Sequence, residues 1–369
     1  MIQGAREMDS LTGAGLPAGH AARRRTLALL FRAVAIATLA SLALSACGGG
    51  GGGDAPGPTP PPPPPPPAPT PTPSPAGPIA AQLTVPTPVG YDAERLAAFN
   101  RLNEIRLSAG LGMLAQSTAM DQAAQAHADW MIANDSFTHE ETAGTMGFTG
   151  ESWPRRDEAF GYVPVGGGEV MSAPVRGAAG IDSLINTVYH RAIMLAVEPV
   201  DVGIGWSTDA ATKVWMPLVI DITRPGTDAT RGLGQAAQAS IHGVTIWPTD
   251  GAHAVPLRLG SENPNPVPSK DVSNLGTPTS ITVDEEATIS ASSFVLANSA
   301  TGVVVPCQVV SSANDPNLLV PRSFIALVPL DPLTPNTTYS VEFEGNTVEF
   351  STRVPVALRR TWSFTTGSQ

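Results

Sequence analysis

The chain has 369 residues, a formal net charge of −11, 14% charged residues and only two cysteines. This length suits about two domains, although part of it has the composition of non-globular segments. Nucleic-acid binding depends on clustered Lys and Arg, and no such cluster follows residue 46. We therefore expect no nucleic-acid partner.

The N-terminus carries the features of a secretion signal. An uncharged run, "AVAIATLASLALS" at residues 33–45, follows Arg23, Arg24, Arg25 and Arg32. A bilayer-spanning helix needs about 20 apolar residues, so this shorter run is typical of a signal peptide. Removing the first 46 residues, with five Arg and two acids, changes the net charge from −11 to −14.

The run ends in "LSAC", which resembles the lipobox of bacterial lipoproteins. We predict a lipoprotein signal peptide at residues 1–46 and a lipid on Cys47 that anchors the protein outside the cytoplasm. The anchor would lie on the outer membrane in a Gram-negative cell. The alternative is an ordinary signal peptide in which the cysteine is incidental. With Cys47 modified, Cys307 is left without a disulfide partner, so packed cores must supply the stability.

Residues 47–88 predict a disordered tether. After Cys47 they contain six consecutive glycines and then a proline-rich stretch. Glycine makes a chain flexible, and polyproline extends it by about 3.1 Å per residue. The tether would hold the folded part away from the membrane.

Three amphipathic helices are predicted in the next segment. Apolar residues recur at helical spacing in residues 91–107, 117–134 and 181–195, and Asp92 suits the N-cap of the first helix. The stretch "NDSFTHEE", which contains His139, comes just after the second helix.

Strands follow the helices. Residues 200–207 alternate with period two and 213–223 predict their hairpin partner, whereas the Gly- and Pro-rich residues 142–180 predict long loops with short elements. Helices first and strands last favour an α+β layered domain. We place a β-rich connector at residues 225–274 and an all-β antiparallel sandwich at 275–369.

Four short motifs resemble bacterial members of the CAP superfamily, named for cysteine-rich secretory proteins, antigen five and pathogenesis-related proteins. They are "FTHEE", "GGEVMS", "NTVYHRAIML" and "VGIGW", in the family's order, and the resemblance supports a domain at residues 89–224. It implies an α-β-α sandwich with a cleft lined by two histidines and two acids, which bind a divalent metal in some members. The motifs assign His139, Glu169 and His190 to that cleft. The second acid corresponds to Thr187, and Glu151 is a substitute that no motif supports.

The C-terminal segment resembles bacterial immunoglobulin-like domains. The pattern "L.P.T.Y.V" occurs at residues 333–341 and "W.F.T" at 362–366. The resemblance implies an immunoglobulin-like sandwich at residues 275–369.

Two imidazoles and a carboxylate are a ligand set for Zn²⁺, with Ca²⁺ or Mg²⁺ as alternatives. Each residue also has a structural interpretation. His139 could be a polar residue at a helix end, His190 a hydrogen-bonding anchor, and Glu169 an acceptor for backbone N–H groups. Glu151 suits a solvated loop, and His127, on an alanine-rich stripe, suits a buried histidine with satisfied nitrogens.

The function that the sequence favours is binding of a ligand or partner at the cell envelope. Candidates are a lipid or small apolar ligand and an envelope or host protein, in addition to the membrane that the lipidated Cys47 would contact. One alternative is a metal-dependent hydrolase of peptide or cell-wall material, with Glu169 or Glu151 as base. Another is a structural adhesin. The acid missing at Thr187 favours binding over catalysis.

Overall fold

The computed structural model describes residues 79–208, 216–226 and 237–368. The predicted signal peptide, Cys47 and most of the predicted tether lie outside these residues. The described residues fall in one compact unit, Pro71–Gln369. None of the helices in the described ranges has the length and apolar character that crossing a bilayer requires.

The first half is an α-β-α sandwich. Its sheet has the order β1-β3-β4-β2, in which β4 is antiparallel to β3 and β2, and β1 is parallel to β3. The strands are β1 (Ala115–Gln116), β2 (Pro164–Ser172), β3 (Asp201–Trp206) and β4 (Leu218–Pro225). The antiparallel β3–β4 pair agrees with the predicted hairpin over the described residues.

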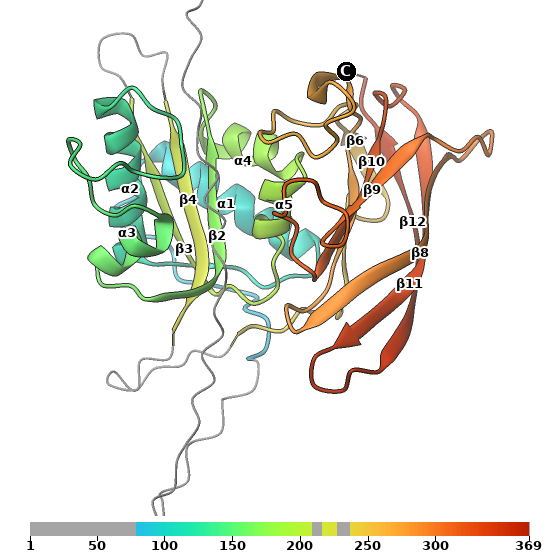
Figure 1. Ribbon diagram of the computed structural model, residues 1–369, viewed down its shortest axis with the longest axis horizontal. Coiled ribbons are helices and arrows are strands. Elements are labelled where there is room, and N and C mark those ends of the chain that lie inside the picture. Colours follow the sequence, from blue (N-terminus) through green and yellow to red (C-terminus); the bar gives the residue numbers. More distant parts are fainter. Residues whose placement is uncertain (1–78, 209–215, 227–236, 369) are drawn as a thin grey trace, which may run out of the picture. The chain divides into compact units, whose positions relative to one another are not determined.

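Helices cover both faces of this sheet (Figure 1). The helices α2 and α3 lie on one face, and α1, α4 and α5 lie on the other. Their bounds are α1 (Ala93–Ser108), α2 (Thr118–Ala133), α3 (Trp153–Ala159), α4 (Gly177–Ile185) and α5 (Tyr189–Met194). The predicted α+β class and α-β-α layering are confirmed for this part.

The first two helices begin where the sequence predicts. Asp92 caps α1 by accepting the backbone N–H of Arg95 at 2.9 Å, and Ser117 caps α2. The third predicted helix, at 181–195, is instead two helices, α4 and α5, separated at residues 186–188. The glycine-rich residues predicted as loop contain the nine-residue strand β2.

The alternation of side chains in β4 divides the domain into two cores. Leu218, Ile220 and Ile222 belong to the cluster formed with α1 and α4. Val219 belongs to the cluster formed with α2. Because neighbouring side chains of a strand point to opposite faces, Asp221 lies on the α2 side of the sheet.

Glycines allow close packing at two places. A Cβ on Gly203 would lie 2.3 Å from the Cβ of Met120, so this glycine lets α2 lie directly against β3. Gly167 has φ +81°, and a Cβ there would meet the carbonyl oxygen of Ile222 at 1.9 Å. It lies where the β2–β4 register shifts, between Val165 and Gly168.

The second half consists of two four-stranded sheets, ordered β5-β7-β10-β9 and β6-β12-β11-β8. Residues of both sheets share one apolar core. The strands are β5 (Thr245–Trp247), β6 (Ala252–Val255), β7 (Thr279–Thr282), β8 (Ala287–Asn298), β9 (Cys307–Ser311), β10 (Phe324–Pro329), β11 (Thr338–Glu349) and β12 (Pro355–Thr366). The short strands β5 and β6, from the predicted connector, pair with β7 and β12. A 3-10 helix occupies Val272–Asn274.

The strand β10 is buried on both faces. Ile325 and Leu327 belong to the core between the two sheets. Phe324 and Ala326 belong to a different cluster, which includes Tyr189 of α5. This explains why the sequence of β10 is continuously apolar instead of alternating. The C-terminal sheets and the α-β-α sandwich therefore share a core at α5.

Candidate functional site

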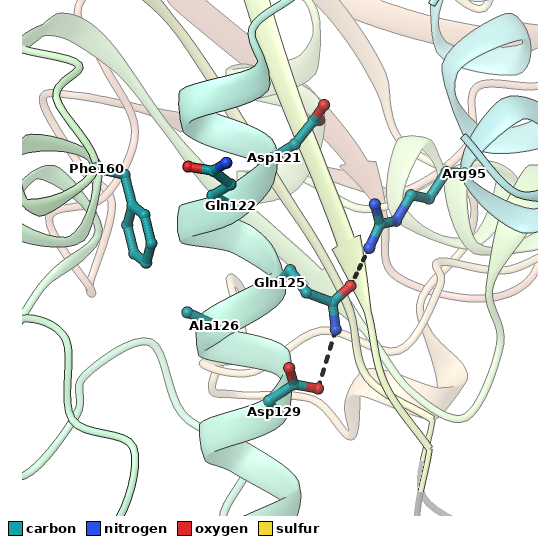
Figure 2. A pocket seen from close by; sticks show the side chains of 7 residues that line it. All are labelled: Arg95, Asp121, Gln122, Gln125, Ala126, Asp129 and Phe160. Carbon is teal, nitrogen blue, oxygen red and sulfur yellow. Dashed lines mark hydrogen bonds between the residues drawn. The ribbon is translucent and has the colours of Figure 1, made fainter. Parts of the chain in front are cut away.

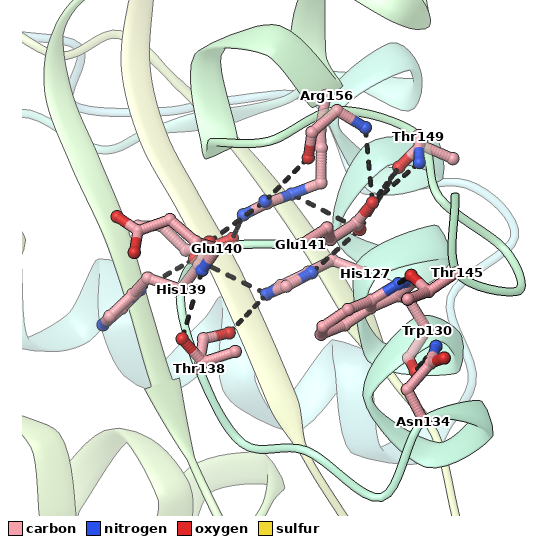
Figure 3. Close-up of polar contacts among 12 residues, drawn as sticks. His127, Trp130, Asn134, Thr138, His139, Glu140, Glu141, Thr145, Thr149 and Arg156 are labelled. Atoms are coloured by element: carbon pink, nitrogen blue, oxygen red, sulfur yellow. Dashed lines mark hydrogen bonds and ion pairs between the residues drawn. The ribbon is translucent and has the colours of Figure 1, made fainter. Parts of the chain in front are cut away.

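His139 is an exposed histidine held by a buried acid. It lies in the loop after α2, and Glu169 lies on β2. The Nδ1 atom of His139 is 2.8 Å from Oε1 of Glu169, and the side chains are 50% and 0% exposed, respectively. Arg156 of α3 donates to the other oxygen of Glu169 at 2.6 Å and to the carbonyl of His139 at 3.0 Å. These contacts fix both the ring and its loop, and Figure 3 labels His139 and Arg156.

These contacts keep Glu169 ionised. Burial alone would raise its pKa, but the hydrogen bond from His139 and the charge of Arg156 hold the pKa of Glu169 below its ordinary value. Since a carboxylate only accepts, His139 donates Nδ1–H to it. The lone pair of the neutral ring is then on Nε2, and His139 is half exposed.

Behind this pair lies a buried histidine, His127 of α2, which is 0% exposed. Its Nδ1 is 3.0 Å from Oε1 of Glu141, and its Nε2 is 2.9 Å from the carbonyl oxygen of Thr138 (Figure 3). Both ring nitrogens thus have partners, which agrees with the predicted role of a satisfied buried histidine. Through Thr138, His127 also supports the loop that carries His139.

Two further acids are buried beside Glu169. Asp221 is directly opposite Glu169 in the β2–β4 register, and Asp157 is in α3. Their exposures are 1% and 0%, and no N–H or O–H donor meets their oxygens among the described residues. Burial, reinforced by the charge of Glu169, raises the pKa of Asp157 to about 7 and that of Asp221 well above its ordinary value. Burial and the charge of Glu169 thus make Asp221 harder to ionise than an ordinary aspartate.

His190 lies at the start of α5 with its side chain 15% exposed. Its Nδ1 is 3.0 Å from the hydroxyl of Thr187 and 3.6 Å from Oε1 of Glu262. Burial lowers the pKa of His190 to about 4, and the nearby His139 acts in the same direction. The ring is therefore neutral at physiological pH, and His139 is near enough to lower its pKa.

The site contains residues that sequence reasoning did not select: Glu141, Arg156, Asp157, Asp221 and Glu262. The one local signal was Asp221, a lone acid inside the apolar run "LVIDIT". Glu151 is exposed, and the described contacts connect it to the site only through its carbonyl oxygen, which accepts the N–H of Glu141 at 3.1 Å.

The contacts within the site favour two imidazoles as metal ligands over the predicted set of two imidazoles and the Glu169 carboxylate. Both oxygens of Glu169 are occupied, one by His139 and one by Arg156. A metal ion would thus be held by His139 and His190, with Glu169 orienting the first ring from behind. Within the described ranges, no group of three or more His, Cys, Asp or Glu residues is arranged to hold a metal ion.

A separate hollow of about 310 Å³ lies along α2 (Figure 2). Its lining includes Arg95, Asp121, Gln125 and Phe160, and none of the residues of the histidine site. Several polar groups there are paired: Gln125 bonds with Arg95 and with Asp129, and Asp121 accepts from the hydroxyl of Tyr91, whereas Nε of Arg95 has no hydrogen-bond partner among the described residues. This surface is therefore distinct from the histidine site.

Comparison with known proteins gives one family match. Residues 99–219 match the cysteine-rich secretory protein family, CAP. Among solved structures, the chain is similar to an extracellular protein containing a SCP domain from Bacillus anthracis str. Ames, solved at 1.5 Å. The identity is 20% and the TM-score 0.29, over 34% of this chain and 39% of that chain. No curated protein matches. The chain carries a CAP domain at residues 99–219.

Proposed function

We propose that the CAP domain binds a ligand or partner outside the cytoplasm through the surface formed by His139 and His190. The observation that carries this proposal is the half-exposed imidazole of His139, fixed at 2.8 Å by a fully buried carboxylate. Burying the charges of Glu169 and Arg156 costs desolvation energy. A binding role for the imidazole ring of His139, which these charges hold in place, accounts for that cost.

The chemistry of the two rings narrows the ligand. Neutral imidazole nitrogens suit Zn²⁺ and similar transition metals, whereas Ca²⁺ and Mg²⁺ prefer oxygen ligands. We therefore put Zn²⁺ first among divalent cations. Exposed apolar side chains in the neighbouring loop, Phe137, Met146 and Phe148, favour a lipid or small apolar ligand as the next candidate.

The test is a calorimetric titration of Zn²⁺ into the full chain and into the His139→Ala and His190→Ala variants. We expect binding with a micromolar Kd that each variant weakens by at least about tenfold. His253→Ala is the matched control, because His253 is exposed on β6, away from the site. If the wild-type chain and both site variants give the same heat, Zn²⁺ is not the ligand. Mass spectrometry of lipids that co-purify with the protein then tests the apolar alternative.

The extracytoplasmic placement has its own support and test. The lipobox-like "LSAC" and the Gly/Pro-rich stretch after it favour a lipid anchor at Cys47, with the folded part held off the membrane. We expect Cys47→Ala to move the protein from the membrane fraction to the soluble fraction. An unchanged membrane fraction would contradict the anchor.

Hydrolysis is the second candidate function, and the pair formed by His139 and Glu169 favours it. An imidazole that donates Nδ1–H to a buried carboxylate has the orientation of a general base. A hydrolase would cleave peptide or cell-wall material with turnover that His139→Ala abolishes. Ligand binding without turnover in wild-type protein would leave binding as the function.

A further inference from the structure

His190 has two oxygen neighbours at one ring nitrogen. Its Nδ1 is 3.0 Å from the hydroxyl oxygen of Thr187 and 3.6 Å from Oε1 of Glu262. Glu262 lies outside the region that matches the CAP family, 72 residues after His190 in the sequence. Its side chain is 0% exposed, so the carboxylate lies buried beside α5.

Glu262 is held in place by the start of α5. Its two oxygens accept the backbone N–H groups of Val188 at 2.8 Å and Tyr189 at 2.6 Å. These N–H groups have no partner within the helix, so the carboxylate acts as the N-terminal cap of α5. The chain around Glu262 is also fixed, because Gly260 donates to the carbonyl of Asn186 at 2.8 Å.

Gly260 is needed for this approach. A Cβ at that position would lie 2.7 Å from the carbonyl oxygen of Ser183 and 3.1 Å from a methyl of Thr187. The segment that carries Glu262 is therefore packed against the end of α4 and the α4–α5 junction. The Glu262 carboxylate therefore approaches Thr187 and His190 from a packed segment, and not from a mobile segment across solvent.

The available donors and acceptors determine the tautomer of His190. The single proton of the Thr187 hydroxyl goes to the carbonyl of Leu184, 2.7 Å away, or to the Glu262 carboxylate. Neither of these groups can donate in return when the carboxylate is ionised. With its proton given to either of these acceptors, the Thr187 oxygen is left to accept from His190, which places the ring proton on Nδ1. The negative charge of Glu262 at 3.6 Å favours the same tautomer.

We propose that Glu262 is a positioning residue of the histidine site, which together with Thr187 holds His190 as the Nδ1–H tautomer and leaves the Nε2 lone pair for a ligand. His139 has the same form through Glu169, so the site presents two like nitrogens. The group that such nitrogens bind is a transition-metal cation or a hydrogen-bond donor. The identity of the ligand rests on the proposed function, but the tautomer of His190 does not.

The test reads the tautomer directly. The full chain, labelled with ¹⁵N-histidine, is measured by long-range ¹H–¹⁵N NMR at pH 8, where Glu262 is ionised. The shifts of the two ring nitrogens distinguish Nδ1–H from Nε2–H, and a His190→Gln variant assigns the signals. We expect His190 to be protonated at Nδ1 in the wild-type chain. A signal from the Nε2–H form would overturn the proposal.

Two variants separate positioning from mere stability. In Glu262→Gln the charge is lost, and an amide N–H₂ replaces one of the two oxygens that accept from Val188 and Tyr189. We expect most of the His190 population to shift to the Nε2–H form. Thr187→Val removes the acceptor hydroxyl with little change of volume, and a mixture of tautomers is expected. If Glu262→Gln does not fold, the tautomer measured in Thr187→Val tests the proposal instead. Retention of Nδ1–H in the folded variants would overturn the proposal.

Glu198→Gln is the matched control. Glu198 is also a buried glutamate that accepts a backbone N–H from the C-terminal half, that of Glu285, but it does not contact the histidine site. Its substitution should leave the His190 signals unchanged. A shift as large as that in Glu262→Gln would mean that the tautomer reports general loosening, which also overturns the proposal.

Zn²⁺ affinity gives a second readout. Residues that orient a metal-ligating histidine typically contribute about 10- to 100-fold to affinity. We expect the Zn²⁺ Kd of Glu262→Gln to rise by about tenfold, with Glu198→Gln unchanged. If the wild-type chain binds no Zn²⁺, the metal form of the proposed function fails. The NMR experiment then still decides the role of Glu262.

Discussion

At the scale of single residues, Arg156 is the cation on which the buried part of the site depends. It is 1% exposed and donates to Glu169 at 2.6 Å, near two further buried acids, Asp157 and Asp221. Removing one partner of a buried ion pair leaves the other charge without compensation. The site therefore depends on this arginine even though no sequence motif marks it.

We predict that Arg156→Met lowers the free energy of unfolding by roughly 3 to 5 kcal/mol, measured by urea denaturation. The neighbouring Arg155→Met is the matched control. Arg155 pairs with Glu158 at 2.6 Å, but their side chains are 69% and 37% exposed. Such pairs contribute about 1 kcal/mol or less. Equal losses in the two variants would contradict a special role for the buried pair.

The sequence identified some residues of the site and not others, and the difference has a physical cause. His139, Glu169 and His190 fall in short motifs, so their positions could be assigned from sequence. Glu262 could not, because its role depends on a contact made 72 residues away along the chain. Asp221 carried a weak signal, since an acid inside an apolar strand must be neutralised or paired.

At the scale of helices and strands, the prediction succeeded where local signals act. The cap Asp92 and the helical spacing of apolar residues located α1 and α2. It failed at residues 181–195, where one predicted helix is two. The N–H groups at the start of α5 are satisfied by Glu262, and a distant carboxylate leaves no trace in local periodicity. The glycines of β2 likewise led to a loop prediction. Glycine is unfavourable within a strand, but here it allows close contacts with neighbouring residues.

The contact between α2 and β3 gives a prediction at this scale. A Cβ on Gly203 would lie 2.3 Å from the Cβ and 2.4 Å from the carbonyl carbon of Met120, so the helix must move. Gly203→Ala should lower the free energy of unfolding by about 1 to 3 kcal/mol or more in urea. Gly367→Ala is the control, because the nearest atom would be 3.5 Å away. Stability equal to wild type in Gly203→Ala would show that α2 can shift without cost.

At the scale of the described unit, the CAP domain and the C-terminal sheets share a core. Phe324 of β10 is 0% exposed and belongs to a cluster with Val188, Tyr189 and Ala192. Tyr189 also donates its hydroxyl to Asp315 at 2.7 Å, and Arg191 donates to the carbonyl of Pro278 at 2.7 Å. These buried contacts favour unfolding of both parts in one transition.

We predict that Phe324→Ala destabilises both parts by about 3 to 5 kcal/mol, the usual cost of such a cavity. Hydrogen exchange measured by mass spectrometry should show α1 and α2 losing protection together with β11 and β12. Phe350→Ala, at a site 43% exposed, is the control and should have little effect. Loss of protection confined to the C-terminal sheets would contradict a shared core.

The buried acids make stability depend on pH. Burial raises the pKa of Glu198 and Glu262 to about 7, and that of Asp201 to about 6, from ordinary values near 4. The folded state therefore keeps protons that the unfolded chain loses. This stabilisation is complete below pH 4 and is lost as pH rises through 6 to 7. His190, with its pKa lowered to about 4, acts oppositely, because its contribution is present above pH 6.5 and is lost toward pH 4.

Raised acids outnumber the one lowered histidine, so we expect the protein to be more stable at pH 5.5 than at pH 8. One pKa unit corresponds to about 1.4 kcal/mol, which for several acids amounts to a Tm lower by several degrees at pH 8. Scanning calorimetry at the two pH values measures this. Glu198→Gln removes one of the proton-holding groups and should reduce the difference between the two Tm values. A Tm that rises from pH 5.5 to pH 8 would mean that these acids are solvated or paired in the folded protein, against their burial.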